Sequence, residues 1–280
     1  MWDIKDKICL ITGGTSGIGK VTAETLADLG ATVTIVGRNE EAGTRIIREI
    51  QEKTGNEMHR FMRTDFASLE KVRELANKFM NQFSRLDVLI NNAGVAFPKK
   101  IITTDGLEAT FAINHFAPFL LTNLLLDLIK QSVPARIINL TSGLHQKATI
   151  NLDDINSNEK FNGMRVYGSS KLANVLFTYS LAEKLKPSGI TANVVHPGFA
   201  RTNLNRSFNI LTRGMMKILP FVISPEKGAE TPIYLVTSPE VEGITGKYFV
   251  RKKAVESSPL SYDKELQQEL WELSAKITKI

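Results

Sequence analysis

The residues Ile8-Cys9-Leu10-Ile11-Thr12-Gly13-Gly14-Thr15-Ser16-Gly17-Ile18-Gly19 decide the fold of this chain. Ile8–Thr12 is apolar and rich in β-formers, which predicts a buried strand. The glycines that follow predict a tight turn, and Ile18–Leu29 has the apolar spacing of a helix. A strand, a glycine turn and a helix in direct succession predict the first unit of a doubly wound α/β sheet.

The glycine turn predicts a nucleotide-binding site. Gly13, Gly17 and Gly19 form the pattern G-x-x-x-G-x-G, which permits a tight turn and close approach of the backbone to a pyrophosphate. The helix N-terminus adds free N–H groups and positive potential. A glycine-rich turn without a ligand is the alternative. We expect the cofactor to be contacted by Gly13, Thr15, Ser16, Gly17, Ile18 and Gly19.

Strand and helix patterns alternate along the chain. We expect strands over Ile8–Thr12, Thr32–Val36, Met58–Met62, Asp87–Ile90, Arg136–Leu140 and Ile190–Val195. We expect helices over Ile18–Leu29, Glu40–Thr54, Leu69–Phe83, Thr104–Lys130 and Val166–Lys186, and a C-terminal helix over 261–278. This alternation predicts an α/β, Rossmann-type doubly wound parallel sheet with helices on both faces. No repeat or linker interrupts 1–280, so we expect a single domain.

Two long connections interrupt the alternation. Leu144–Arg165 follows the fifth strand and Ala200–Ser224 follows the sixth. Both should emerge at the carboxyl edge of the sheet, where open α/β folds bind ligands. The second is apolar and contains Met215 and Met216, so we expect 200–224 to act as a lid over a lipophilic substrate. A contact with a second subunit is the alternative.

Composition excludes several other classes of protein. The chain is 42% hydrophobic with a net charge of +6 and no long run of like charges, so no nucleic-acid binding is expected. Cys9 is the only cysteine and no zinc spacing is present, so no metal site is expected. The longest apolar stretch, Phe116–Ile129, is too short and too polar to cross a bilayer, and no signal peptide is visible. A cytoplasmic location is therefore expected.

The end of the second strand bears on the choice of nucleotide. It reads Val36-Gly37-Arg38-Asn39, without the acidic residue that commonly binds the ribose hydroxyls of NAD. The Arg38 guanidinium can pair with a 2′-phosphate, and Asn39 adjoins it, so the sequence favours NADP(H) over NAD(H). An exposed loop arginine is the alternative, and the nearby Glu40 weakens the argument.

Two further strand ends complete the expected nucleotide site. Asp65 follows the third strand and can accept a hydrogen bond from adenine, although an N-cap of the next helix is the alternative. Asn92, Ala93 and Gly94 close the fourth strand, where small residues let the backbone approach the cofactor ribose. Asn91 and Asn92 can equally brace the turn.

The segment Tyr167-Gly168-Ser169-Ser170-Lys171 predicts proton-transfer chemistry. Its phenol and ammonium are one helical turn apart and therefore share a face. A cation beside a tyrosine favours the phenolate, which makes the phenol a better proton donor or acceptor near neutral pH. A chance pair on a surface helix is the alternative, and the upstream motifs argue against it.

In this order, these motifs resemble the classical short-chain dehydrogenase/reductase family over about residues 5 to 250. The resemblance rests on the glycine turn, Asn91-Asn92-Ala93-Gly94, Asn114, Ser142, the segment from Tyr167 to Lys171, and His196-Pro197-Gly198. Within the family, the chain is most similar to the retinol dehydrogenase-like and WW-domain oxidoreductase-like group. That similarity rests on Ser170-Lys171-Leu172-Ala173-Asn174, on Leu270-Trp271-Glu272-Leu273-Ser274, and on the long gap between Ser142 and Tyr167.

The resemblance implies a catalytic set of Asn114, Ser142, Tyr167 and Lys171. Tyr167 would be the general acid in carbonyl reduction, with Ser142 binding the substrate oxygen. Lys171 would depress the pKa of Tyr167 and bind the ribose, and the counterpart of Asn114 holds a water that links the lysine to solvent. Pro197, Gly198 and Thr202 would contact the nicotinamide half of the cofactor.

Alternatives for these residues stay open at this point. Ser142 can instead cap a turn, and Asn114 can satisfy buried backbone. His115 and His145 are left out of the mechanism, because a Tyr/Lys pair already moves the proton. His196 is expected to support the end of its strand.

The resemblance implies an NADP(H)-dependent oxidoreductase that interconverts an alcohol with an aldehyde or ketone. The small-molecule substrate is expected to be lipophilic, like a retinoid or steroid carbonyl, and the family also forms homodimers. An NADP(H)-binding regulatory protein without turnover is one alternative. A sugar-nucleotide epimerase or dehydratase of the extended branch is another, although the glycine spacing and the chain length argue against it.

Overall fold

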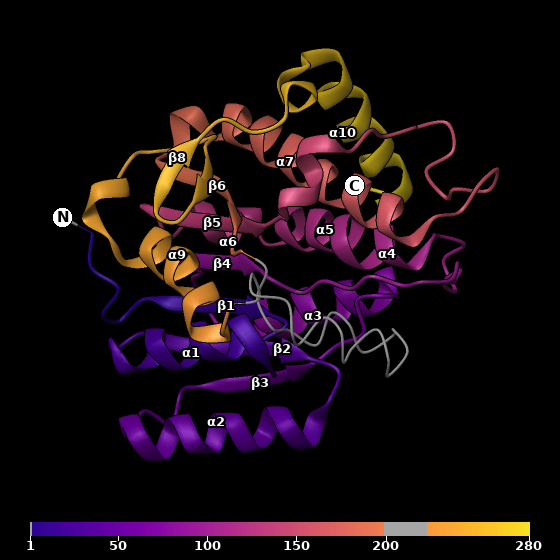
Figure 1. Ribbon diagram of the computed structural model, residues 1–280. Coiled ribbons are helices and arrows are strands. Elements are labelled where there is room, and N and C mark those ends of the chain that lie inside the picture. Colours follow the sequence, from indigo (N-terminus) through magenta and orange to yellow (C-terminus); the bar gives the residue numbers. More distant parts are fainter. Residues whose placement is uncertain (1, 199–222) are drawn as a thin grey trace.

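A computed structural model describes residues 2–198 and 223–280 of the chain. Within these ranges the strands form one eight-stranded sheet in the order β3-β2-β1-β4-β5-β6-β7-β8 (Figure 1). The strands are β1 Ile8–Thr12, β2 Thr32–Gly37, β3 Arg60–Arg63, β4 Val88–Asn91, β5 Ala135–Leu140, β6 Ile190–His196, β7 Tyr248–Val250 and β8 Lys253–Val255. All neighbouring pairs are parallel except β7 with β8, so the predicted doubly wound sheet is confirmed.

Both faces of the sheet are covered, which explains why its strands are apolar without alternation. Leu10 of β1 packs in one core with α3 Leu69–Gln82 and α5 Ala117–Leu124. Its neighbours Cys9 and Ile11 point the other way, into a core with helices α1 Gly17–Asp28, α2 Glu40–Thr54 and α9 Pro225–Thr237. The two cores fix the sheet as the middle layer of the molecule.

The helix expected over Thr104–Lys130 is the clearest local difference. It begins only at α4 Ala109–Phe111, where the buried Glu108 carboxylate caps it by accepting from Phe111 N at 3.0 Å. The chain then forms a π-helix over Ala112–Phe116 before α5, and a separate helix α6 spans Leu126–Lys130. Apolar periodicity cannot reveal such a widened turn, which often marks a functional site.

The C-terminal part contains elements that the sequence pattern did not predict. Helix α9 starts after its N-cap Ser224, and β7 and β8 extend the sheet as a short hairpin. Helix α7 Gly163–Leu185 is longer than expected, and α10 Lys264–Thr278 matches the expected C-terminal helix. Figure 1 shows α10 running across α7, and the two helices are in contact.

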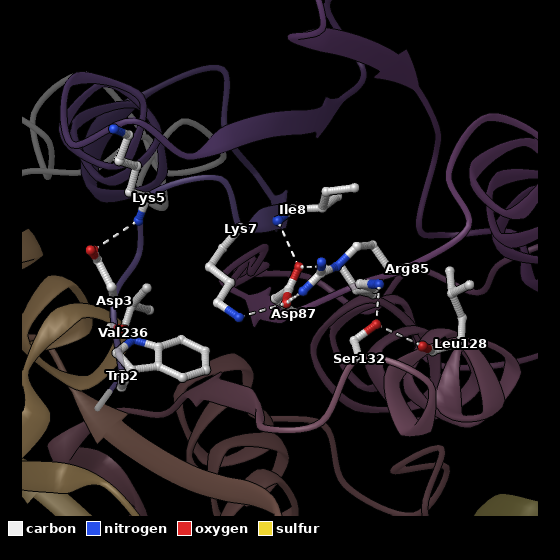
Figure 2. Close-up of polar contacts among 11 residues, drawn as sticks. Trp2, Asp3, Lys5, Lys7, Ile8, Arg85, Asp87, Leu128, Ser132 and Val236 are labelled. Atoms are coloured by element: carbon white, nitrogen blue, oxygen red, sulfur yellow. Dashed lines mark hydrogen bonds and ion pairs between the residues drawn. The ribbon is translucent and has the colours of Figure 1, made fainter.

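A buried carboxylate joins the starts of β1 and β4 (Figure 2). Asp87 is fully buried, and its Oδ2 accepts from Ile8 N at 2.9 Å and from Arg85 Nε at 3.0 Å. Its Oδ1 lies 3.2 Å from Lys7 Nζ and also accepts from Arg85 Nη2. A buried charge needs such partners, so this cluster stabilises the amino edge of the sheet, opposite the edge where ligands bind.

We expect Asp87→Ala to lower the free energy of unfolding by about 2–4 kcal/mol, because two cations and one backbone donor lose their acceptor. Urea denaturation measures the change. The control is Asp127→Ala, which removes an exposed ion pair with Lys130 at 2.9 Å and should cost at most about 1 kcal/mol. Equal losses for both variants would contradict a stabilising role for the cluster.

Candidate functional site

The carboxyl ends of β1 and β4 meet at the glycine turn. Gly13 adopts φ 69°, and a Cβ there would lie 2.8 Å from Asn92 Nδ2 and 3.0 Å from Ala93 Cα. Asn92 Nδ2 donates to the carbonyls of Thr12 at 2.8 Å and Gly13 at 3.2 Å. Asn92 therefore braces the turn, which was one of its two predicted uses, and the turn leaves no room for side chains at its centre.

The start of α1 remains available to an anion. Its N-cap Ser16 makes no side-chain capping bond, and the first turn carries no acidic residue. Gly19 is buried against the turn, where a Cβ would lie 2.4 Å from Gly13 O. The predicted residues Gly13 to Gly19 therefore form a compact cradle, and within the described residues no side chain accepts from their N–H groups.

The end of β2 is shaped by Thr15. A Cβ on Gly37 would lie 2.6 Å from Thr15 Cγ2 and 2.9 Å from its Oγ1, so any side chain at 37 would collide with the glycine turn. Arg38 beyond it is exposed, and Asn39 caps α2 by accepting from Ala42 N at 2.9 Å. Glu40 lies 3.3 Å from Arg63 Nη1 rather than being bound to Arg38. Glu40 therefore argues less strongly against Arg38 as a ligand of a 2′-phosphate than its position in the sequence suggested.

Asp65 lies at the end of β3 with its side chain exposed. Its Oδ1 accepts from Ala67 N at 3.0 Å, and Ser68, not Asp65, is the N-cap of α3. The alternative of a helix cap at Asp65 is therefore wrong.

Four predicted residues come together around Gly94. A Cβ on Gly94 would lie 3.3 Å from Lys171 Nζ and 3.4 Å from Asn114 Oδ1. Lys171 Nζ is 5.8 Å from the centre of the Tyr167 ring, and the Tyr167 hydroxyl has a hydrogen bond from Ser142. Tyr167, Ser142 and Lys171 are all at least nine-tenths buried. Helix α7 and the end of β5 thus bring a phenol, a hydroxyl and an ammonium to one place.

The electrostatics of this cluster differ from the expectation. Burial raises the pKa of Tyr167 to about 12, against a smaller lowering by the Ser142 hydrogen bond. Burial also lowers the pKa of Lys171 to about 8. The Lys171 ammonium donates to Leu140 O at 3.2 Å. In this arrangement burial, rather than the charge of Lys171, sets the direction in which the pKa of the phenol is shifted.

Asn114 and Ser142 have structural contacts besides their place in the cluster. The Asn114 side chain accepts from Val95 N at 2.8 Å and donates to Val95 O at 2.9 Å and to Ser170 Oγ at 3.0 Å. Ser142 Oγ accepts from Leu144 N at 3.3 Å at the start of a 3₁₀-helix over Gly143–Lys147. The predicted backbone and turn uses are therefore both present.

Two histidines support the backbone on either side of the cluster. His196 Nδ1 accepts from Gly143 N at 3.2 Å and from Gly198 N at 3.4 Å, which links the end of β5 to the Pro197-Gly198 turn. His145 lies within 2.7 Å of Ser142 O through Nδ1, and its Nε2 accepts from Ser258 N at 3.3 Å. Burial lowers the pKa of both, to about 4 for His196, so both are neutral at physiological pH.

Three contacts of the site were not predicted. Lys171 and Asn174 both donate to Leu140 O, and the Thr15 side chain fills the space beside Gly37. Of these contacts, the sequence pointed only to that of Asn174, which lies about one helical turn after Lys171. The predicted Thr202 and nearly all of the predicted lid over 200–224 lie outside the described residues.

The described residues contain no cluster of His, Cys, Asp and Glu suited to a metal ion. None of the helices that the structure describes combines the length and apolar character needed to cross a bilayer.

Comparison with known proteins places the chain among oxidoreductases. A family model described as short chain dehydrogenase matches residues 7–210. The chain is 42% identical to human retinol dehydrogenase 14 over 288 residues, which covers 96% of this chain and 85% of the relative. It is 39% identical to human polyprenol dehydrogenase over 283 residues, covering 98% and 86% of the two chains.

Solved structures agree with the fold. A crystal structure of an uncharacterized protein from Mycobacterium paratuberculosis superposes with a TM-score of 0.81 at 30% identity, covering 99% of this chain and 95% of that one. A short chain dehydrogenase from Burkholderia cenocepacia in complex with NADP superposes with a TM-score of 0.71 at 27% identity, covering 89% and 97%. The chain therefore belongs to the short chain dehydrogenase family, as an oxidoreductase of the retinol dehydrogenase-like group that binds a nicotinamide cofactor.

Proposed function

We propose that this protein is an NADP(H)-dependent oxidoreductase that interconverts a lipophilic alcohol with its aldehyde or ketone. The observation that carries the proposal is the buried cluster of Tyr167, Ser142 and Lys171 around Gly94, beside a glycine turn that suits a dinucleotide. Neither feature alone implies redox chemistry, but their adjacency supports a proton donor beside a bound nicotinamide.

The residues of the cluster have distinct proposed roles. Tyr167 protonates the carbonyl oxygen during reduction and accepts the proton back during oxidation. Ser142 donates to the same oxygen and stabilises its developing negative charge. The Lys171 ammonium favours the phenolate and holds the cofactor ribose. Both hydrogens of Asn114 Nδ2 are already donated, to Val95 O and Ser170 Oγ. A water that links Lys171 to solvent would therefore be bound by the side-chain or backbone oxygen of Asn114.

The strand ends fit a nicotinamide dinucleotide. The cradle from Gly13 to Gly19 would hold the pyrophosphate, and Asn92, Ala93 and Gly94 would line the ribose site. Asp65 is exposed at the end of β3 and would accept from the adenine. Pro197 and Gly198 would border the nicotinamide, and Thr202 is proposed from the family pattern alone. When bound, the cofactor supplies or accepts the hydride.

The preference for NADP(H) rests on the end of β2. No acidic side chain fits at Gly37, whereas the Arg38 guanidinium is exposed beside it. Asn39 is engaged as the cap of α2, so its backbone rather than its side chain is suited to the nucleotide. Relatives crystallised with NADP or NADPH at 27% and 28% identity support the preference.

We expect Arg38→Glu to lower the NADPH/NADH ratio of kcat/KM by about 10- to 100-fold, because a charge-assisted bond to the 2′-phosphate is replaced by repulsion. Steady-state kinetics with both cofactors measure the ratio. Arg48→Glu makes the same change of charge on an exposed position of α2 and is the control. An equal ratio in both variants would remove Arg38 from cofactor selection.

The substrate proposal rests on the named relatives and on the apolar sequence of 200–224. Two relatives are named for retinol and for polyprenol, which are both lipophilic isoprenoid alcohols. We therefore propose a bulky isoprenoid or steroid-like alcohol or carbonyl. A homodimer and a cytoplasmic location stay predictions of the sequence.

The test is consumption of NADPH by the purified protein, with NADH in parallel, over a panel of retinal, a prenyl aldehyde, a steroid ketone and reducing sugars. Turnover with the lipophilic carbonyls is the expected result. Faster turnover with the sugars would overturn the substrate class. Tight NADPH binding with no turnover in either direction would overturn the enzyme proposal in favour of a regulatory cofactor-binding protein.

A further inference from the structure

His115 lies deep in the molecule between the C-terminal helix and α7. It belongs to the π-helix Ala112–Phe116 and is fully buried. Its Nε2 lies 2.8 Å from the hydroxyl of Ser274, which is a buried residue of α10. The side chain of the preceding residue, Asn114, points instead toward the end of β4, where it accepts from Val95 N and lies beside Gly94. The widened turn thus directs two consecutive polar side chains to different parts of the molecule.

Two buried polar atoms near this contact have no hydrogen-bond partner among the described residues. They are the other ring nitrogen of His115, Nδ1, and the side-chain oxygen Oδ1 of Asn174 in α7. The Asn174 side chain nevertheless raises the pKa of His115 through a hydrogen bond, against a larger lowering by burial to about 4. The neutral ring accepts through Nε2 from the Ser274 hydroxyl, which leaves Nδ1 as a donor that can pair with the Asn174 oxygen.

Asn174 and Lys171 share one acceptor. Asn174 Nδ2 donates to Leu140 O at 3.2 Å, and Lys171 Nζ donates to the same oxygen at 3.2 Å. An amide has one oxygen end and one nitrogen end, so the donor at His115 fixes which end faces Leu140. With His115 in place, Asn174 presents its NH₂ group, not its oxygen, to the neighbourhood of the lysine.

We propose that His115 is a positioning residue for Lys171, acting through the amide orientation of Asn174 and held in turn by Ser274 of the C-terminal helix. This inference rests on the proposed function of Lys171. Without the donor at His115, the amide can turn and offer Oδ1 to the ammonium. The lysine would then be drawn away from Tyr167, so turnover would fall while the fold and the affinity for the cofactor remained.

The proposed positioning role accounts for three features that the proton transfer alone does not explain. These are the direction of His115 in the π-helix, the amide of Asn174 beside Leu140, and the buried Ser274 hydroxyl of α10. The titratable group facing Lys171 on its own helix is Tyr167. Burial lowers the pKa of Lys171. The side chains beside its ammonium, Asn114 of the π-helix and Asn174 of its own helix, are uncharged.

His115→Phe is the decisive variant. The ring is surrounded by Phe116, Phe119 and Phe177, with centroids 5.2, 6.2 and 6.2 Å away, so a phenyl ring suits the site and only the hydrogen bonds are lost. We expect kcat to fall about 10-fold with KM for NADPH within about twofold. His115→Gln, which offers both a donor and an acceptor, should restore most of kcat.

Ser274→Ala tests the link to α10 if His115→Phe fails to fold. It should lower kcat in the same direction. Thr278→Val is the matched control, because it removes a buried hydroxyl of the same helix whose partner is Ser274 O at 2.6 Å and not His115. Unchanged kcat in both His115→Phe and Ser274→Ala, or an equal loss in Thr278→Val, would overturn the proposal.

A second readout does not need turnover. The titration of Lys171 can be followed by NMR of protein carrying ¹³C-labelled lysine, with the signal assigned by Lys171→Arg. An amide oxygen turned toward the ammonium stabilises its charge, so His115→Phe should raise the midpoint by about half a pH unit or more. An unchanged midpoint would contradict the positioning role. Failure of the wild-type protein to turn over any carbonyl would instead contradict the proposed function.

Discussion

Tyr167→Phe is expected to lower kcat for carbonyl reduction at least about 1,000-fold while NADPH still binds. The phenol is the proposed proton donor to the substrate oxygen, and phenylalanine removes its hydroxyl without changing the packing of a buried ring. Ser142 would keep its hydroxyl but lose its partner on α7. Single-turnover kinetics and titration of NADPH fluorescence separate the chemical step from cofactor binding.

Tyr179→Phe is the control for this variant. Tyr179 is a buried tyrosine of the same helix whose hydroxyl is 2.7 Å from Ser257 Oγ, away from Gly94 and Lys171. Its activity should stay within about twofold of the wild-type value. A Tyr167→Phe protein that retained wild-type turnover would show that another group delivers the proton.

Lys171→Ala should impair both cofactor binding and chemistry. The ammonium is the proposed ligand of the ribose and the cation that favours the phenolate, so we expect kcat to fall at least about 100-fold and KM for NADPH to rise. Lys184→Ala, at an exposed position of α7, should change neither. Loss of kcat without a change in cofactor affinity would limit Lys171 to proton chemistry.

The pKa of Lys171 also gives the wild-type enzyme a pH dependence. Its value is lowered to about 8 by burial, so the side chain is charged below pH 8 and becomes neutral above it. The rate of carbonyl reduction by the wild-type enzyme should therefore decline above about pH 8. In Lys171→Ala the plot of rate against pH should no longer show this decline. The variant's thermal stability must be checked in parallel, because a buried side chain is truncated.

The regular part of the fold could be predicted from the sequence. Glu40–Thr54 was predicted to its ends, because Asn39 and Gly55 are strong cap residues and four apolar residues repeat along one face. The third strand was displaced toward its C-terminal end, to Arg60–Arg63, because exposed Met58 is apolar without being buried. β7 and β8 have three residues each, too few for a periodic signal.

The site was predicted by residue type but not by its contacts. Tyr167, Ser142, Lys171 and Asn114 were named in advance, and the structure brings them together. Their hydrogen bonds were not predictable, because the partners are backbone atoms such as Leu140 O and Val95 N that no residue pattern marks. His115 was left out because a Tyr/Lys pair already moves the proton. Its contact with Ser274 was not predictable, since the two residues lie far apart in the sequence.

The contact between Thr15 and the bare backbone of Gly37 constrains how this enzyme could be redesigned for NADH. A single exchange of Gly37 for aspartate would force the new Cβ to within 2.6 Å of the Thr15 methyl group. An acid at position 37 would therefore need a smaller residue at position 15 in the same variant, whereas an acid at position 38 would not. A library that varies position 37 alone would miss the first route, because the Thr15 side chain occupies the space that the new side chain needs.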